Sequence, residues 1–100
     1  MMSFEDAAQR VYAKVEGIVQ REVAGETLLV PVRGKLADLQ RVFTLEELPL
    51  FIWDRLDGAV TLAAIRQAMV DAYDVDVDQA GCDLVDFVGE LADAGLIELK

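Results

Sequence analysis

Hydrophobic positions change their period near Leu45, and this change divides the chain into two halves. Before that point, apolar residues recur in short extended runs that are separated by turn residues. After it, they recur at three- and four-residue intervals, which is the spacing of amphipathic helices. Strands followed by helices predict an α+β fold.

Three extended runs are expected to form an antiparallel sheet. Residues 18–23 and 27–32 are separated by a turn at 24–26, which is the clearest hairpin signal in the chain. Pro31 cannot donate a hydrogen bond to a strand ladder, so we expect it at a sheet edge or near a strand end. The third run, 39–44, alternates its side chains between two faces and is expected to be the last strand of the sheet.

Two helices are predicted between the third run and residue 74. The first begins at Glu46 or later, because Pro49 must fall in the first turn, where its missing N–H would have no helical partner anyway. It is expected to stop at residues 57–58. Thr61 is a suitable N-cap for the second helix, which is expected to end near Asp74.

A third helix is predicted from an N-cap at Asp76 to a terminator at Gly95, and the tail 96–99 can add a short strand. Trp53 lies beside the apolar stripe of the first helix, where a core aromatic is expected and a ligand-facing tryptophan is the alternative. The apolar stripes of the three helices consist of Leu48, Phe51, Ile52 and Leu56, then Leu62, Ile65, Met69, Ala72 and Tyr73, then Leu84, Phe87, Val88 and Leu91.

The N-terminal segment permits two interpretations. Apolar residues at helical spacing within 3–15 favour a short amphipathic helix, but Gly17 soon interrupts the pattern, so an extended arm is the alternative. A chain of 100 residues can bury one hydrophobic core. We therefore expect a single domain over 1–100, with residues 1–14 as its arm or short helix.

Composition places the chain among globular proteins, with 54% hydrophobic and 28% charged residues. No apolar run is long enough to span a membrane, and the N-terminus has no basic segment followed by an apolar signal core. A cytoplasmic protein without a membrane partner is expected.

Charge and residue types argue against several functions. Nineteen acidic residues against nine basic ones give a formal net charge of −10, which repels the phosphates of nucleic acids. Histidine, the usual general base and commonest metal ligand, is absent. Cys82 has no partner for an internal disulfide and is expected to be a small, semi-buried helix residue. We therefore expect no catalytic residues, no metal site and no cofactor.

Acidic residues follow a helical spacing in the predicted third helix, at Asp83, Asp86, Glu90 and Asp93. This spacing places them along one side of the helix. A solvated face is the ordinary explanation, because surface helix faces are normally charged. The alternative is that part of this face rims a groove for a basic segment.

Four segments carry a resemblance to a known family: REVAGETLLVPVRG, FTLEELPLFIWDRLDG, TLAAIRQAMVDAYDV and DLVDFVGELADAGLIE. They are similar to the protein D family of pyrroloquinoline quinone synthesis and its wider PqqD-like group, from about Val15 to the C-terminus. The most telling parts are the patterns IW..LDG, YDV and D..DF...L...GLI. None of these motifs is catalytic, so the resemblance concerns the fold. Glu46 stands where the family commonly has asparagine.

The resemblance implies a winged helix-turn-helix-like domain, in which a three-stranded antiparallel sheet packs on three helices. Such domains recognise the leader of a ribosomally made precursor peptide and present it to a modifying enzyme. In the namesake pathway that enzyme is a radical S-adenosylmethionine protein, so the iron–sulfur and adenosyl chemistry would belong to the partner.

The resemblance also implies a groove between the third strand and the third helix. An extended leader could add a strand to the sheet edge there, with main-chain hydrogen bonds for affinity and side-chain pockets for selectivity. The candidate peptide-binding residues are Leu39, Gln40, Arg41, Val42, Phe43 and Thr44 on the strand, and Asp83, Asp86, Phe87 and Glu90 on the helix. Core packing is the alternative for Phe43 and Phe87, which lie on apolar periodic faces. The acidic residues would favour a basic leader segment.

The same sequence pattern can be compared with three other classes of protein: a DNA-binding domain, a homodimer or scaffold, and an enzyme. A DNA-binding winged helix shares the coarse order of elements, but its recognition helix would carry basic or amide side chains rather than acidic ones. A homodimer or scaffold is possible, because an unprotected sheet edge can pair with a second copy. A stand-alone enzyme is disfavoured, because no nucleophile with a base and no metal constellation can be drawn.

Overall fold

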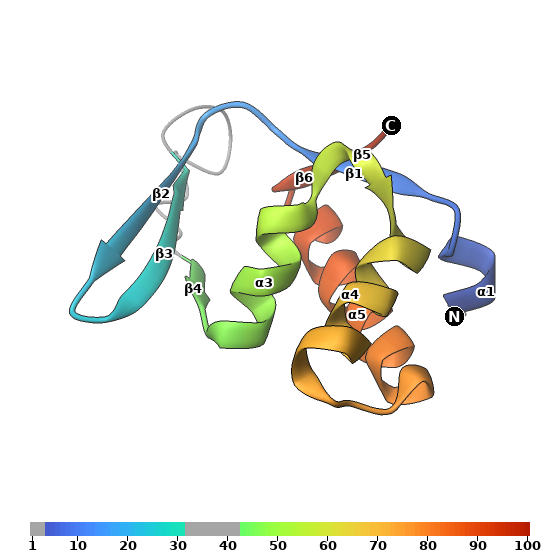
Figure 1. Cartoon of the computed structure of the whole chain (residues 1–100). Coiled ribbons are helices and arrows are strands. Elements are labelled where there is room, and N and C mark those ends of the chain that lie inside the picture. The colour runs from blue at the N-terminus through green and yellow to red at the C-terminus, as the bar shows by residue number, and fades with distance from the viewer. Residues whose placement is uncertain (1–3, 32–42) are drawn as a thin grey trace.

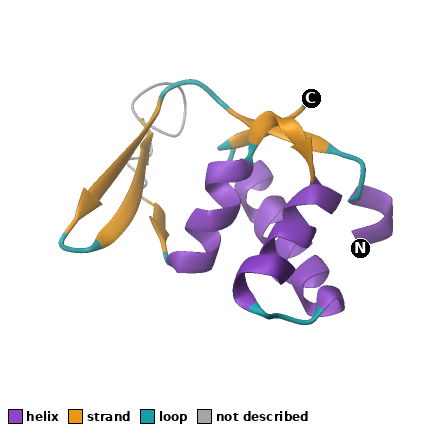
Figure 2. Ribbon diagram, in the orientation of Figure 1, coloured by secondary structure: helices purple, strands orange, loops and turns teal. Residues whose placement is uncertain are grey.

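A computed structural model describes residues 4–31 and 43–100 of the chain. The elements are α1 (Phe4–Ala7), β1 (Val11–Lys14), β2 (Ile18–Val23), β3 (Glu26–Pro31), β4 (Phe43–Leu45), α3 (Glu47–Arg55), β5 (Asp57–Thr61), α4 (Leu62–Tyr73), α5 (Val77–Asp93) and β6 (Ile97–Leu99). The helices gather in one body, and the hairpin β2–β3 projects to one side of it (Figures 1 and 2). The expected α+β class is confirmed.

The predicted hairpin and its third strand form one antiparallel sheet in the order β2-β3-β4. Val23 pairs with Glu26 across a two-residue turn. Both turn residues have a positive φ, 53° at Ala24 and 83° at Gly25, as a type I′ hairpin turn requires. Pro31 is the last residue of β3, which agrees with the expected strand end.

A second antiparallel sheet, in the order β5-β1-β6, was not predicted as a unit. Within the N-terminal segment only Phe4–Ala7 is helical, and the strand Val11–Lys14 that follows pairs with both β5 and β6. The helix in this segment is therefore limited to Phe4–Ala7, and the extended part that follows it is a paired strand. The expected strand in the tail is confirmed as β6.

The stop expected at residues 57–58 needs a correction. Helix α3 ends at Arg55 with Leu56 as its C-cap, and Asp57 already begins β5. Gly58 has a φ of 81°, and a Cβ atom there would lie 3.3 Å from the Cβ of Ala13 on β1. Glycine is suited to this position because the backbone turns left-handed while it lies close to a neighbouring strand.

The predicted ends of the last two helices are confirmed. The Thr61 hydroxyl accepts a hydrogen bond from the backbone N–H of Ala64 at 3.2 Å and caps α4. A carboxylate oxygen of Asp76 accepts from two backbone N–H groups and caps α5. Gly95, with a φ of 79°, ends α5 in a Schellman motif, in which the N–H of Leu96 donates to the carbonyl of Leu91.

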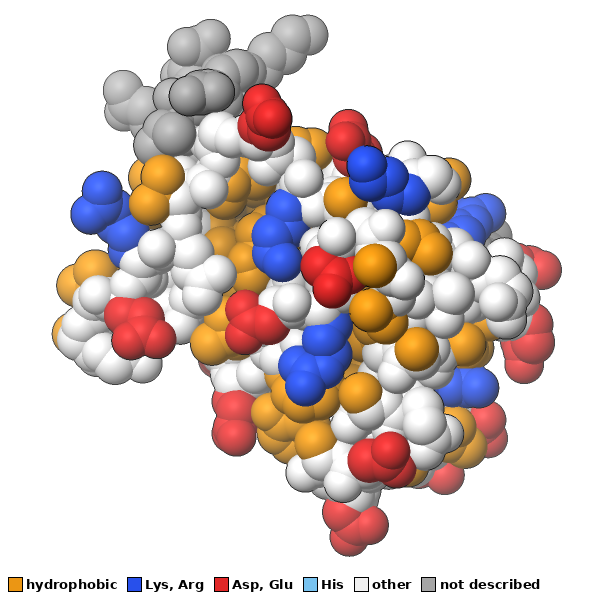
Figure 3. All heavy atoms as spheres, turned by 45° about the horizontal axis from the view of Figure 1, so that its top comes forward, with side chains coloured by type: hydrophobic (Ala, Val, Ile, Leu, Met, Phe, Trp, Pro, Cys, Tyr) orange, Lys and Arg blue, Asp and Glu red, His pale blue; other side chains and the backbone are white. Residues whose placement is uncertain are grey.

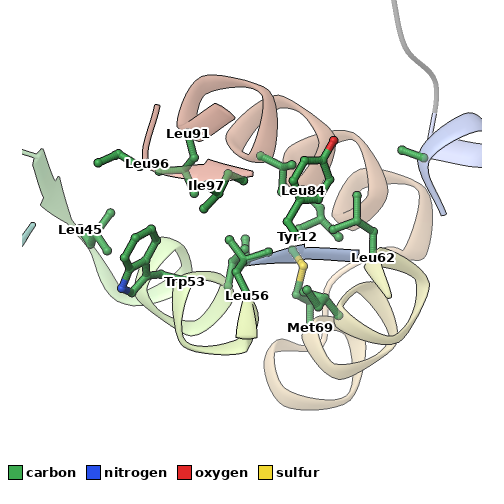
Figure 4. Packing of buried hydrophobic residues seen from close by; sticks show 14 of the residues in the cluster. Tyr12, Leu45, Trp53, Leu56, Leu62, Met69, Leu84, Leu91, Leu96 and Ile97 are labelled. Carbon is green, nitrogen blue, oxygen red and sulfur yellow. The ribbon is translucent and has the colours of Figure 1, made fainter. Parts of the chain in front are cut away.

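The core lies between the three long helices and the β5-β1-β6 sheet (Figure 4). Trp53 is 2% exposed, as expected for a core aromatic, and its Nε1–H donates to the side-chain oxygen of Gln20 on β2 at 3.2 Å. Two burial expectations are wrong, because Ala72 and Cys82 are both exposed. Each lies on the outer side of its helix, which a short apolar residue can occupy at little cost.

Candidate functional site

A hollow of about 470 Å³ lies between β4 and the C-terminal half of α5. Its walls consist of Phe43, Thr44, Leu45, Phe87, Glu90, Leu91, Asp93 and Ala94. On the face that Figure 3 presents, hydrophobic side chains also gather where the projecting hairpin meets the helical body. Because β4 belongs to the hairpin sheet and α5 to the helical body, the hollow lies between these two parts of the fold.

Helical periodicity builds the α5 wall. Phe87, Leu91 and Ala94 follow one another at intervals of four and three residues, so their side chains lie on one face of the helix. Leu91 is only 3% exposed and belongs to the core, whereas Phe87 is half-buried. The apolar surface of this wall is thus continuous with the interior.

The opposite wall is the short strand β4. Leu45 is 6% exposed and is seen beside Trp53 in Figure 4, while Phe43, two residues earlier, is half-buried and packs against the core. Residues two apart in a strand project from the same face. The hollow is therefore bounded on both sides by side chains that the core holds in place.

Strand β4 is the last strand of its sheet within the described residues. Its three residues pair with β3 on one side, from Thr27↔Leu45 to Leu29↔Phe43. No other described strand pairs with its second side. An edge strand presents backbone N–H and C=O groups that an extended peptide can bind.

Two carboxylates stand at the rim of the hollow. Glu90 and Asp93 are exposed, and both belong to its lining. They lie three residues apart near the C-terminal end of α5, whose last turn contains no basic residue. The hollow thus combines an apolar floor with an acidic rim.

The ten residues predicted for the site fall into three groups. Phe43, Thr44, Phe87 and Glu90 come together around the hollow. Asp83 and Asp86 are exposed on α5 and do not line the hollow, and Asp83 accepts a hydrogen bond from the Gln79 side chain at 2.8 Å. Leu39, Gln40, Arg41 and Val42 lie outside the described residues.

The sequence interpretation missed four residues of the lining, Leu45, Leu91, Asp93 and Ala94. The signal for three of them is present in the sequence, because Leu45 continues the alternation from Phe43, and Leu91 and Ala94 continue the helical face of Phe87. Asp93 is recognisable only as part of the acidic face. Phe43 and Phe87 each pack against the core and also line the hollow, so core packing does not exclude them from the candidate site.

Residues 4–31 and 43–100 contain no group of three histidine, cysteine, aspartate or glutamate side chains that could hold a metal ion. Within the same ranges, no helix is both long enough and apolar enough to pass through a membrane.

The fold of this chain is similar to those of solved structures, and its sequence matches the model of a known family. The structure of TbiB1 in complex with the TbiA(beta) leader peptide superposes with a TM-score of 0.71 at 24% identity, over 86% of this chain and 94% of TbiB1. Lasso peptide synthetase B1 complexed with the leader peptide superposes with a TM-score of 0.73 at 17% identity, over 87% and 96% of the two chains. No curated protein matches the sequence. The family model for coenzyme PQQ synthesis protein D (PqqD) matches residues 26–97, most of the chain, and the chain therefore belongs to the PqqD family.

Proposed function

We propose that this chain is a non-catalytic recognition domain that binds the leader of a ribosomally made precursor peptide. The observation that carries the proposal is the hollow between the edge strand β4 and helix α5. Membership of the PqqD family supports it, as do two structures of the same fold that were solved with leader peptides.

The leader binds as an additional strand. Its main chain pairs with β4 on the side that faces away from β3, and the side chains of alternate residues turn toward α5, where Phe43, Phe87 and Leu91 receive an apolar group. Because β4 is already fixed by β3 and by the core contacts of Leu45, little ordering of the protein is needed on binding. Most of the affinity then comes from main-chain hydrogen bonds and one buried side chain.

The chemistry of modification belongs to a separate enzyme, for which a radical S-adenosylmethionine protein is our candidate. The sequence has no histidine and one cysteine, which suits a chain that binds a peptide without transforming it. The recognition domain would raise the local concentration of the precursor near that enzyme.

A backbone-methylation scan tests the strand addition. For this scan, a leader peptide that binds the chain is synthesised with an N-methyl group at one residue at a time, and each version is titrated calorimetrically. Because only every second N–H of an added strand faces β4, we expect affinity to fall at alternate positions. Losses at nearly every position beyond the first turn would indicate a bound helix, because each interior N–H of a helix donates to the carbonyl four residues earlier. Unchanged affinity throughout would exclude main-chain pairing.

A further inference from the structure

The position of the rim carboxylates is unfavourable for the helix that carries them. Glu90 and Asp93 lie close to the C-terminus of α5, the end at which the aligned peptide dipoles of a helix create a partial negative charge. Acidic side chains are disfavoured at this end, and cations are favoured. Helix stability therefore gives no reason for two carboxylates beside the hollow.

None of the six basic residues that the structure describes belongs to the lining of the hollow. Lys14 lies over the Trp53 ring at 5.1 Å, Arg55 over Phe51 at 3.4 Å and Arg66 over Phe4 at 3.9 Å. Glu90 and Asp93 are the charged residues of the lining.

We infer that the hollow selects leader peptides that carry a lysine or arginine two residues from the apolar side chain that fills it. This inference rests on the proposed function and names the chemistry of its ligand. Residues two apart in a strand lie on the same face, about 6.6 Å from each other. Cβ atoms three residues apart on a helix are separated by about 5 to 6 Å. A basic side chain next to the buried group can therefore reach Glu90 or Asp93.

Charge also argues against a second copy of this chain as the occupant. The chain carries a formal net charge of −10, so an identical partner would bring further negative charge to an acidic rim. A basic and apolar peptide segment meets both parts of the hollow. The floor accepts its apolar side chain, and the rim accepts its cation.

The first test selects ligands from random sequences, so the natural precursor need not be identified. A phage-displayed library of random 12-residue peptides is selected on the full chain, and the bound peptides are sequenced. We expect enrichment of lysine or arginine two positions from a large apolar residue. An enriched peptide is then synthesised with lysine, glutamine or glutamate at that position. Replacement of lysine by glutamate should weaken binding on the order of tenfold at low salt, and less at high salt.

A charge-reversal variant assigns the effect to the rim. In the double variant Glu90→Lys and Asp93→Lys, we expect the glutamate peptide to bind more tightly than the lysine peptide. The control is Glu5→Lys with Asp71→Lys, two exposed positions outside the hollow. Each substitution adds two charges, so both double variants move the net charge from −10 to −6. The single variant Glu90→Gln repeats the test with a smaller perturbation of the fold.

The outcomes separate this inference from the function on which it rests. Equal binding of the lysine, glutamine and glutamate peptides by the unmodified chain would overturn the inference and leave leader recognition intact. An equal change of preference in the control variant would also overturn it, because the effect would then follow net charge alone. A chain that binds no peptide at all would overturn both.

Discussion

Trp53 connects parts of the molecule that are distant in sequence. It lies on α3 with 2% exposure, its indole N–H donates to Gln20 on β2, and the Lys14 ammonium of β1 lies over its ring. Its burial could be predicted from its place beside an apolar stripe. Its two polar contacts could not, because Lys14 and Gln20 come close only when both sheets have formed.

Truncation of this tryptophan should damage the fold severely. Trp53→Ala removes a large buried side chain and leaves Gln20 without its donor, so we expect the free energy of unfolding to fall by about 3 to 5 kcal/mol. That loss approaches the whole stability of a marginal domain. Urea denaturation followed by circular dichroism measures it, and Trp53→Phe is the control that retains most of the volume. An unchanged unfolding midpoint in Trp53→Ala would contradict the core position.

Lys14 gives stability a predictable dependence on pH. Desolvation lowers the pKa of its ammonium below 10.5, while the carboxylates of Asp54 and Asp57 act in the opposite direction. In the interval between the folded pKa and 10.5, the unfolded chain binds more protons than the folded one, so stability rises with pH there. Below the pKa of the folded state, Lys14 is charged in both the folded and the unfolded chain, and its desolvation lowers the free energy of unfolding by the full amount.

A variant without a titrating group isolates this effect. We expect the free energy of unfolding of the unmodified chain, measured relative to Lys14→Met, to increase as the pH is raised toward 10.5. Denaturant titrations of both proteins at several alkaline pH values provide the comparison. A constant or falling difference would show that Lys14 is not desolvated.

At the scale of elements, single capping and terminating residues in the sequence predicted correctly where α4 and α5 begin and where α5 ends. Thr61, Asp76 and Gly95 were recognisable because caps and terminators act through neighbouring residues. The β5-β1-β6 sheet was not recognisable, because its pairings join Val11 with Thr61 and Tyr12 with Leu99. Strand pairing of this kind depends on tertiary packing and leaves only a weak periodic signal in a four-residue strand.

The N-terminus of α3 lacks a side-chain cap, so a better capping residue there should increase the stability of the protein. Its N-cap, Glu46, has the extended backbone of a capping residue but makes no side-chain capping hydrogen bond. Asparagine is among the best N-cap residues, so Glu46→Asn should raise the free energy of unfolding by about 0.5 to 1 kcal/mol. Thermal and urea unfolding measure the gain, and Glu47→Gln is a control at the adjacent helical position. No gain would mean that the start of α3 is fixed by Leu45 and the core alone.

At the scale of the whole molecule, the site arises where the projecting hairpin sheet meets the helical body (Figure 1). The α5 wall could be predicted from periodicity, and the edge position of the third strand from the order of the strands. The hollow itself could not, because its volume depends on how β4 and α5 approach each other in space. Helix α5 carries acidic residues where a DNA-binding winged helix needs a basic surface to meet phosphates, so we expect no DNA binding.

Hydrogen exchange on leader binding tests the central claim most directly. The full chain is exchanged with and without the leader peptide, and the protection of each backbone amide is measured by NMR. We expect new protection at Phe43–Leu45, because the added strand pairs with β4, together with smaller changes near Phe87 and Leu91 on α5. The outer strand β2 should be unchanged and serves as the internal control. Protection confined to Phe4–Lys14, with β4 and α5 unaffected, would contradict the account.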